Sequence, residues 1–268
     1  MTTSDNAAAH LEHLRAQRPL VHNITNYVAM DFSANALLAL GASPAMVHAV
    51  EEVEDFVQLA SALVLNVGTL SPRWVDAMRV AADRAEERGI PIVLDPVGVG
   101  ATPYRTEVAA GLAGRATVVR GNASEIIALA GAASAPTRGV DSTHEVDAAA
   151  DAARALAERF GCVAVVSGPV DLATDGTTEL RVSGGSPLMG SVTAMGCALS
   201  AAIGAFLGSR PDGTPPLAAA VHALDLFGVA GARAGAKSQG PGSFRVAFVD
   251  ALHQVGPTDL AGSGGIGG

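Results

Sequence analysis

Short aliphatic runs alternate with longer helical patterns along this chain, and this alternation constrains the fold most. Runs rich in Val, Ile, Leu and Ala occupy residues 62–66, 90–95, 116–120 and 162–167. Parallel strands are buried on both faces and therefore read as continuous apolar runs. The segments between the runs carry apolar residues at helical spacing, so the sequence predicts repeated βαβ units around a mostly parallel sheet, an α/β fold.

The helices expected between these strands end at glycines. They span residues 27–40, 72–88, 123–130 and 146–160, and each is followed by a C-terminal stop: Gly41, Gly89, Gly131 and Gly161. Residues 171–174 and 178–182 flank the turn residues Asp175 and Gly176, which predicts a hairpin.

After residue 190 the pattern becomes mostly helical. Helices are expected at residues 195–207, 217–236 and 243–253, and we interpret them as a layer covering one face of the same sheet. The sequence therefore predicts a single domain over residues 1–255, followed by a flexible, glycine-rich tail over residues 256–268.

Composition and charge exclude several classes of function. Hydrophobic residues make up 49% of the 268 residues and charged residues 16%, a balance typical of a chain that buries a core. The net charge is −9 with a single lysine, so we expect no nucleic-acid partner. The apolar stretches are too short to span a membrane, and residues 1–17 do not resemble a signal peptide, so we expect no membrane partner and a cytoplasmic location.

The strongest local signal for chemistry lies in residues 192–200, where small residues lead directly into an apolar helix. The backbone amides of Met195, Gly196 and Cys197 are expected to converge at the helix N-terminus, where anions are stabilised. The positive end of the helix dipole also lowers the pKa of a thiol, which makes Cys197 a candidate base or nucleophile. A buried structural cysteine is the alternative.

Two acidic residues are candidates for holding Mg²⁺. Asp95 ends a predicted strand and precedes a glycine-containing loop, which is where open α/β sheets place ligands. Asn122 and Glu125 open a helix after another strand, and they also fit a simple capping box. Asp95 and Glu125 at one edge of the sheet are suited to holding Mg²⁺ mainly through water.

A polar run stands between two apolar stretches at residues 22–26, with the sequence His-Asn-Ile-Thr-Asn. The amide and hydroxyl side chains in this run, including Asn23 and Asn26, are suited to orienting a small polar ligand. His22 is more typical of a structural residue than of a catalytic one.

Seven segments in order along the chain together resemble the hydroxyethylthiazole kinase family. They are HNITN (22–26), NALLALGASPAM (35–46), NVGT (66–69), LDPV (94–97), RGNASE (120–125), TAMGCALS (193–200) and GPGSF (240–244). The resemblance implies a ribokinase-like three-layer αβα fold without a lid domain. It also implies a homotrimer with active sites between subunits, and ATP-dependent phosphorylation of 4-methyl-5-(2-hydroxyethyl)thiazole in thiamine salvage.

The same resemblance implies roles for individual residues. Met46 and Ala194 match substrate-contact positions, and Arg120 and Ser167 match positions that contact the nucleotide. Asp95 and Glu125 match the acidic residues near magnesium, and Cys197 stands where ribokinase-like relatives carry an aspartate general base. Alanine at 194 replaces the family's glycine and disfavours a positive φ, and serine at 167 replaces a threonine but keeps the hydroxyl.

These roles give a mechanistic hypothesis. Phosphoryl transfer mostly requires positioning and neutralisation of charge. The amides of Met195, Gly196 and Cys197 are expected to face the transferring phosphoryl group as an anion hole, while Cys197 deprotonates the substrate hydroxyl. Two alternatives stay open at this point: a hydrolase or transferase with a cysteine nucleophile, and a non-catalytic small-molecule binding protein of the same fold.

Overall fold

The strands form a sheet in the order β2-β1-β3-β4-β5-β6-β7-β8-β9. The computed structural model describes residues 3–133, 145–261 and 266–267. The first six strands in this order, from β2 through β1 to β6, pair in parallel. The strands β7, β8 and β9 add antiparallel pairs at the β6 end of the sheet. The strands are β1 (Leu20–Ile24), β2 (Ser43–Ala45), β3 (Ala62–Asn66), β4 (Ile92–Asp95), β5 (Val118–Asn122), β6 (Val163–Ser167), β7 (Val170–Thr174), β8 (Glu179–Ser183) and β9 (Ile266–Gly267).

Side chains of the central strands alternate between two buried faces. In β3, Val64 packs into one core, whereas Leu63 and Leu65 pack into the other. In β4, Val93 packs into the same core as Val64, and Leu94 packs into the opposite core. Because successive side chains of a strand point to opposite faces, a continuous apolar run fills both cores at once.

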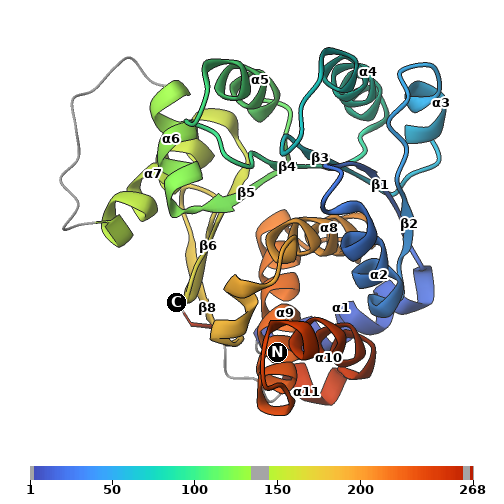
Figure 1. Ribbon diagram of the computed structural model, residues 1–268, viewed down its shortest axis with the longest axis vertical. Helices are drawn as coiled ribbons and strands as arrows, with labels where there is room; N and C mark the ends of the chain where they lie inside the picture. The colour runs from blue at the N-terminus through green and yellow to red at the C-terminus, as the bar shows by residue number, and fades with distance from the viewer. Residues whose placement is uncertain (1–2, 134–144, 262–265, 268) are drawn as a thin grey trace.

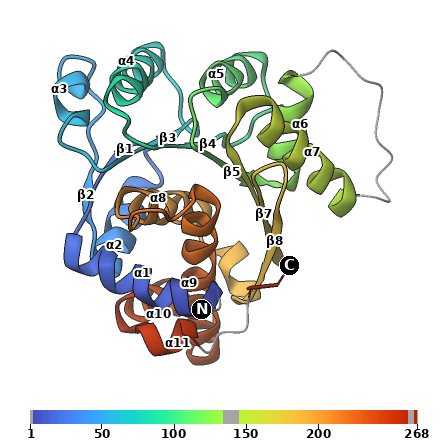
Figure 2. The same cartoon turned by 180° about the vertical axis from the view of Figure 1, so that it is seen from behind.

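Helices cover both faces of the sheet, which gives three layers (Figure 1). The core on one face is shared by α3 (Val53–Val57), α4 (Pro72–Arg88), α5 (Pro103–Ala113), α6 (Ala123–Ala133) and α7 (Glu145–Phe160). The core on the other face is shared by α1 (Thr3–Gln17), α2 (Met30–Leu40), α8 (Met195–Gly208), α9 (Pro216–Lys237), α10 (Pro241–Gln254) and α11 (Pro257–Ala261), and Figure 2 shows this layer from behind. The predicted αβα fold, with the late helices covering one face, is confirmed.

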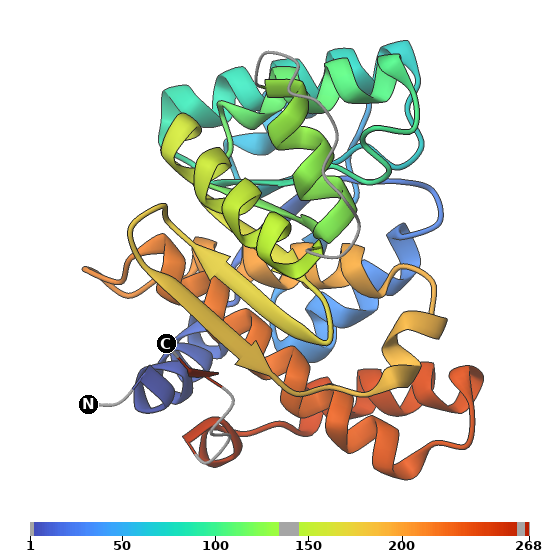
Figure 3. The same cartoon turned by 90° about the vertical axis from the view of Figure 1, so that its left-hand side faces the viewer.

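The predicted hairpin is present. β7 and β8 pair antiparallel across the turn at Asp175 and Gly176, as Figure 3 shows from their side of the molecule. The prediction that Gly131 stops a helix is wrong, because α6 continues to Ala133. Gly41 adopts a φ of +104°, whereas Gly131 is not among the glycines with positive φ. A glycine flanked by alanines costs a helix about 1 kcal/mol but does not end it.

Two features of the C-terminal half differ in detail from expectation. Residues 257–261, expected in a flexible tail, form α11, because Leu260 is fully buried in the core. Residues 262–265 and 268 of that tail lie outside the described residues, and β9 pairs with β8. The helix α9 is long and apolar enough to cross a membrane by length and composition alone, yet most of it is buried inside the protein. Its apolar character therefore fits a core helix.

A buried histidine pair ties α1 to α9. Nδ1 of His10 lies 2.9 Å from Nδ1 of His222, and Nε2 of His10 lies 3.0 Å from the carbonyl oxygen of Phe206 in α8. A carbonyl only accepts, so the proton of His10 is on Nε2, and His222 donates between the rings. Burial, together with His222, lowers the pKa of His10 to about 4, and burial lowers the pKa of His222 to about 4.

We therefore predict that the protein loses stability between about pH 6.5 and pH 4. Unfolded histidine has a pKa of about 6.5, so in this window the unfolded chain binds protons that the folded pair does not. The stabilisation is present above the unfolded pKa and is lost as the pH falls. At about 1.4 kcal/mol per pKa unit, it amounts to on the order of 3 kcal/mol for each histidine.

Urea unfolding across this pH window checks the prediction. Replacing His10 and His222 together by leucine removes both titrating groups and leaves an apolar pair, so the dependence of the unfolding free energy on pH becomes flatter. His22, whose pKa burial also lowers to about 4, is present in both proteins and does not affect the comparison. Equal slopes in the two proteins would show that the pair is not the acid-sensitive element.

Candidate active site

Polar side chains gather where the parallel strands end. The carboxyl ends of parallel strands meet at one edge of a sheet, which is where open α/β folds bind ligands. In the order of the strands, the residues at or just beyond these ends are Met46 after β2, Asn26 after β1, Asn66 in β3, Asp95 in β4, Asn122 in β5 and Ser167 in β6. The sequence motifs that are scattered along the chain are thereby brought together in one row.

The N-terminus of α8 faces the middle of this row. Ala194 is its N-cap with a φ of +68°, and the first backbone hydrogen bond of the helix runs from the Ala198 amide to the Ala194 carbonyl, at 2.9 Å. The amides of Met195, Gly196 and Cys197 precede that bond and have no acceptor one turn back in the helix. They form the positive end of the helix, as the anion-hole hypothesis requires.

Arg120 adds a permanent positive charge at the same point. A Cβ atom on Gly196 would lie 2.5 Å from Nη1 of Arg120, so only glycine lets the guanidinium lie against the start of the helix. Arg120 is 8% exposed, donates to the Ser167 hydroxyl and lies 3.9 Å from the Asp95 carboxylate. Its Nε has no partner among the described residues, so it retains a donor for a bound phosphate.

Asp95 is fully buried beside Arg120. One carboxylate oxygen, Oδ2, accepts from the Asn66 amide at 2.8 Å and from the Ser200 hydroxyl at 2.9 Å. The other oxygen, Oδ1, has no partner in the described part of the chain. Burial raises the pKa of Asp95 to about 6, Glu125 adds to the rise, and Arg120 opposes it.

Glu125 lies close to Asp95 but is already engaged by backbone. Its Oε2 accepts from the Asn122 amide at 2.9 Å, and the Asn122 side chain accepts from the Glu125 amide at 2.9 Å. This is the predicted capping box. Its Oε1 accepts from the Gly98 amide at 2.8 Å, which fastens the loop after β4.

The two carboxylates fit a magnesium site of the kind that proteins build for nucleotides. The described residues contain no group of three His, Cys, Asp or Glu side chains able to hold a metal. Mg²⁺ bound with a nucleotide needs only one or two carboxylates, because water and phosphate supply its other ligands. The unpartnered Oδ1 of Asp95 is a buried oxygen available for such a ligand.

Cys197 is held by two amide side chains. Its sulfur accepts from Asn66 Nδ2 at 3.2 Å and from Asn26 Nδ2 at 3.4 Å. Burial raises the pKa of the Cys197 thiol to about 11, Asp95 adds to the rise, and the two amides oppose it. The expectation of a lowered pKa is wrong, because the loss of water around the sulfur outweighs the two amide hydrogen bonds and the charge of Arg120.

A cavity of about 550 Å³ opens beside Arg120 on the β6–β8 side of the row. Both residues predicted to contact the nucleotide line it, together with the start of α8: Arg120, Ser167, Met195 and Gly196. The rest of the wall comes from the β6–β7 turn and β7, including Asp171, from the segment after β8, from Leu199 of α8 and from Phe227 and Gly228 of α9. The positive end of α8 and Arg120 therefore face a cavity of a size that suits a small ligand.

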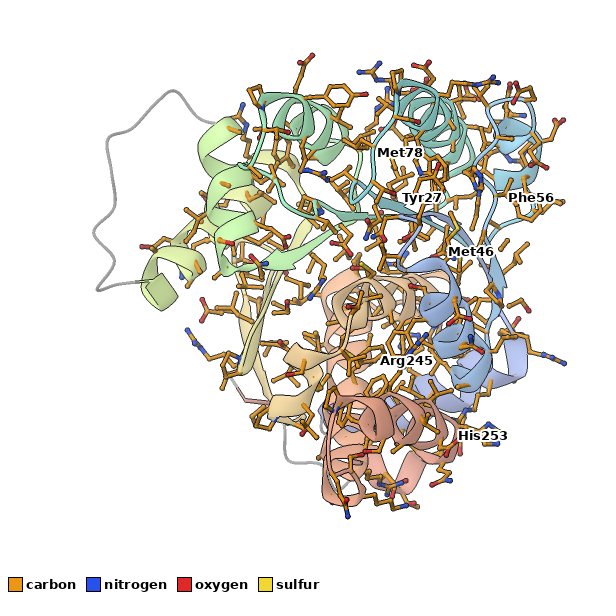
Figure 4. The ribbon with its side chains drawn as sticks, viewed as in Figure 1. Tyr27, Met46, Phe56, Met78, Arg245 and His253 are labelled. Carbon is orange, nitrogen blue, oxygen red and sulfur yellow. The ribbon has the colours of Figure 1, made fainter. Side chains whose placement is uncertain are left out.

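Of the residues predicted to contact the substrate, Met46, Asn23 and Asn26 lie toward the other end of the row, whereas Ala194 is the N-cap of α8 at its middle. Figure 4 shows Met46 on the same side of the molecule as Phe56, away from the β6–β8 side. Asn23 is 2% exposed, its Nδ2 donates to the Val21 carbonyl, and its Oδ1 has no partner among the described residues. Asn26 is already bonded to Asn66 and Cys197, and its own contact with substrate stays a prediction.

Sequence reasoning missed two residues that complete the site. Asn66 and Ser200 lie within the sequence motifs, where no role is predicted for them, yet both donate to Asp95. A polar residue at the end of an otherwise apolar strand, such as Asn66 after Leu-Val-Leu, is a signal that identifies such positions. Ser200 gives no such signal, because its role depends on the distance between α8 and β4.

Comparisons with known proteins agree on one family. The sequence matches the Hydroxyethylthiazole kinase family over residues 11–258. It is 52% identical to a hydroxyethylthiazole kinase of Nitratidesulfovibrio vulgaris, over 94% of this chain and 96% of that protein. The structure of the hydroxyethylthiazole kinase of Pyrococcus horikoshii has 41% identity and a TM-score of 0.86, covering 95% of both chains.

A more distant structure shows the fold alone. A ribokinase-like superfamily protein of Enterococcus faecalis is 13% identical, with a TM-score of 0.63 over 91% of this chain and 89% of that one. Every strand in the described ranges joins one sheet, in agreement with a fold that has no lid domain. The fold is thus the one that this ribokinase-like protein has, and the family match makes the chain a kinase. Within that class, the family match and the 52% identity show that the chain belongs to the hydroxyethylthiazole kinase family.

We predict that Ala194→Gly stabilises the protein by about 1 kcal/mol. A left-handed conformation costs a residue with a Cβ about 1–2 kcal/mol, which glycine avoids, while glycine adds a smaller entropic cost in the unfolded chain. Urea unfolding measures the difference. As a control, Ala232→Gly on the exposed side of α9 is expected to destabilise by about 1 kcal/mol. A loss of stability in both variants would refute strain at Ala194.

Proposed function

We propose that this chain transfers the γ-phosphoryl group of ATP to the primary hydroxyl of 4-methyl-5-(2-hydroxyethyl)thiazole. The names of its relatives support the substrate. The observation that carries the proposal is the position of the α8 N-terminus, between the cavity beside Arg120 and the strand ends near Asn26 and Met46. ATP is assigned to the cavity beside Arg120, and the alcohol to the strand ends near Asn26 and Met46. Thiamine salvage is the process that this reaction serves.

The reaction needs little covalent help from the protein. The hydroxyl oxygen forms a bond to the γ-phosphorus as the bond to the bridging oxygen breaks and ADP leaves. Arg120 and Ser167 bind the phosphates, and the amides of Met195, Gly196 and Cys197 stabilise the charge that develops during transfer. Asp95 and Glu125 are the residues to hold Mg²⁺, which neutralises phosphate charge when it is bound.

Cys197 is the proposed acceptor of the hydroxyl proton. It takes the proton only as a thiolate, and a pKa near 11 makes thiolate scarce in the ligand-free chain at neutral pH. A loose transition state requires little deprotonation at the moment of transfer, so the contribution of a base is modest. The amides around the sulfur also argue against a cysteine-nucleophile hydrolase, whose thiol needs a histidine partner.

We further propose a homotrimer with active sites between subunits, located in the cytoplasm, where ATP is made and used. Large apolar side chains are exposed near α2 and on α10, with Val28 at 61%, Leu38 at 60% and Val246 at 65% exposure. A second cavity of about 470 Å³ lies between Val28, Thr193 and the start of α10. Thr193 adjoins Ala194, so a neighbouring subunit over this face closes the acceptor side of the site.

We predict that Cys197→Ala slows turnover by about 10²-fold without abolishing it, because general bases contribute about 10²–10⁴-fold. Cys197→Asp stays active, since a carboxylate also accepts a proton. Coupled ADP release with ATP and the thiazole alcohol measures both variants, and mass spectrometry checks the phosphorylated product. An inactive aspartate variant that folds normally would remove the base role. Thiazole binding without ADP release would instead favour a binding protein.

We predict that Asp95→Asn raises the Mg²⁺ concentration for half-maximal activity by at least about tenfold. Asparagine keeps the oxygen that Asn66 and Ser200 contact but places an uncharged group at the unpartnered position. The matched control is Asp212→Asn on the exposed loop before α9, which leaves the titration unchanged. A magnesium titration that coincides with that of the wild type would place the metal elsewhere.

A further inference from the structure

Asn66 uses its whole side chain to join three parts of the site. It is 1% exposed at the end of β3. Its Oδ1 accepts from Asn26 Nδ2 at 2.8 Å and from the Gly68 amide at 2.9 Å. Its Nδ2 donates to the Asp95 carboxylate at 2.8 Å and to the Cys197 sulfur at 3.2 Å. Every donor and acceptor position of this amide therefore has a partner.

Backbone amides fix which end of each asparagine faces the sulfur. A backbone N–H only donates, so the Gly68 amide defines the oxygen of Asn66. In the same way, the amides of Val28 and Ala29, at 3.1 and 2.9 Å, define the oxygen of Asn26. The NH₂ groups of both side chains must then point to Cys197. Two NH₂ groups thus donate to the sulfur, and neither side-chain amide can flip to present its oxygen instead.

The close approach of these groups depends on a glycine. A Cβ atom on Gly68 would lie 2.6 Å from Asn26 Nδ2 and 2.8 Å from its Cβ. The loop after β3 therefore comes close enough to fasten Asn66 only because residue 68 has no side chain. The loop after β3, Asn66 and Asn26 are therefore joined by hydrogen bonds, and the two asparagines contact the Cys197 sulfur.

We propose that Asn66 is a positioning residue for phosphoryl transfer, which fixes the Cys197 sulfur relative to the Asp95 carboxylate, with Asn26 as the second support of the sulfur. The proposal rests on the proposed function. As the hydroxyl proton moves to the thiolate sulfur, the two N–H donors keep the sulfur aimed at the acceptor oxygen. Asn66 also donates to Asp95. It therefore holds Cys197, the proposed proton acceptor, and Asp95, the proposed magnesium ligand, at a fixed distance from each other.

A double-mutant cycle separates positioning from a merely structural role. Asn66→Ala is expected to lower kcat at least about tenfold with little change in the KM for ATP or alcohol. If Asn66 acts through Cys197, Asn66→Ala costs much less once Cys197 is alanine. The matched control is Ser200→Ala, because Ser200 donates to the same Asp95 oxygen, and no bond from its hydroxyl to Cys197 occurs among the described residues. Its coupling with Cys197→Ala is expected to be weaker than that of Asn66→Ala, because Ser200 reaches the sulfur only through Asp95 and Asn66.

The cycle gives a clear result either way. If Asn66→Ala couples to Cys197→Ala no more strongly than Ser200→Ala does, the positioning proposal is overturned, while the proposed kinase activity is unaffected. Asn66→Ser replaces the alanine variant if the latter does not fold. A wild-type protein that releases no ADP with the thiazole alcohol would instead contradict the proposed function, and a readout independent of activity then tests the positioning.

That readout is the alkylation rate of Cys197 by iodoacetamide at one pH, in a Cys162→Ala background. Asn26→Asp keeps the shape of the side chain and an oxygen that accepts from the amides of Val28 and Ala29 in the turn before α2. It replaces the donor to the sulfur by an acceptor, so alkylation slows at least about threefold. An unchanged or faster rate would show that the amide does not act on the sulfur.

Discussion

The close contact between α8 and the sheet determines the rest of the site. Small residues recur every four positions along the helix and face the strands: Gly196, Ser200, Gly204 and Gly208. A Cβ on Gly204 would lie 2.9 Å from the Val64 side chain, and one on Gly208 would lie 2.8 Å from Ser61. Helical glycine costs about 1 kcal/mol, which the buried contact must offset. In return, the helix N-terminus reaches the strand ends and Ser200 reaches Asp95.

This contact also places different groups on the two sides of the α8 N-terminus. The positive end of α8 and Arg120 face the cavity on the β6–β8 side, where Ser167 ends its strand. Asn26 lies after β1, on the opposite side of Cys197 in the order of the strands. Because the sheet is mostly parallel, all these groups lie at the same edge. The proposed function places the phosphoryl donor and acceptor on the two sides of this helix terminus.

Local sequence predicted the elements whose pattern is continuous and missed those whose burial comes from distant contacts. β3 and α4 were predicted at their observed bounds because an apolar run and a Ser-Pro start with a glycine stop act locally. The residues of β1 predict a polar run instead of a strand, because His22 and Asn23 stand in its middle, although both are buried. The row of strand ends was predictable from topology and motifs. The hydrogen bonds of Asn66 were not, because they join four segments of the chain.

The neutral thiol of Cys197 explains how so many polar groups are buried together. Asp95 carries a buried negative charge, Arg120 lies 3.9 Å away, and the pKa of Asp95, near 6, keeps it mostly ionised at neutral pH. A carboxylate at position 197 would add a further buried negative charge beside Asp95 and Glu125, and like charges at one site are costly to ionise together. A thiol that stays protonated in the empty site avoids this repulsion, so the ligand-free fold buries Cys197 without a further anion.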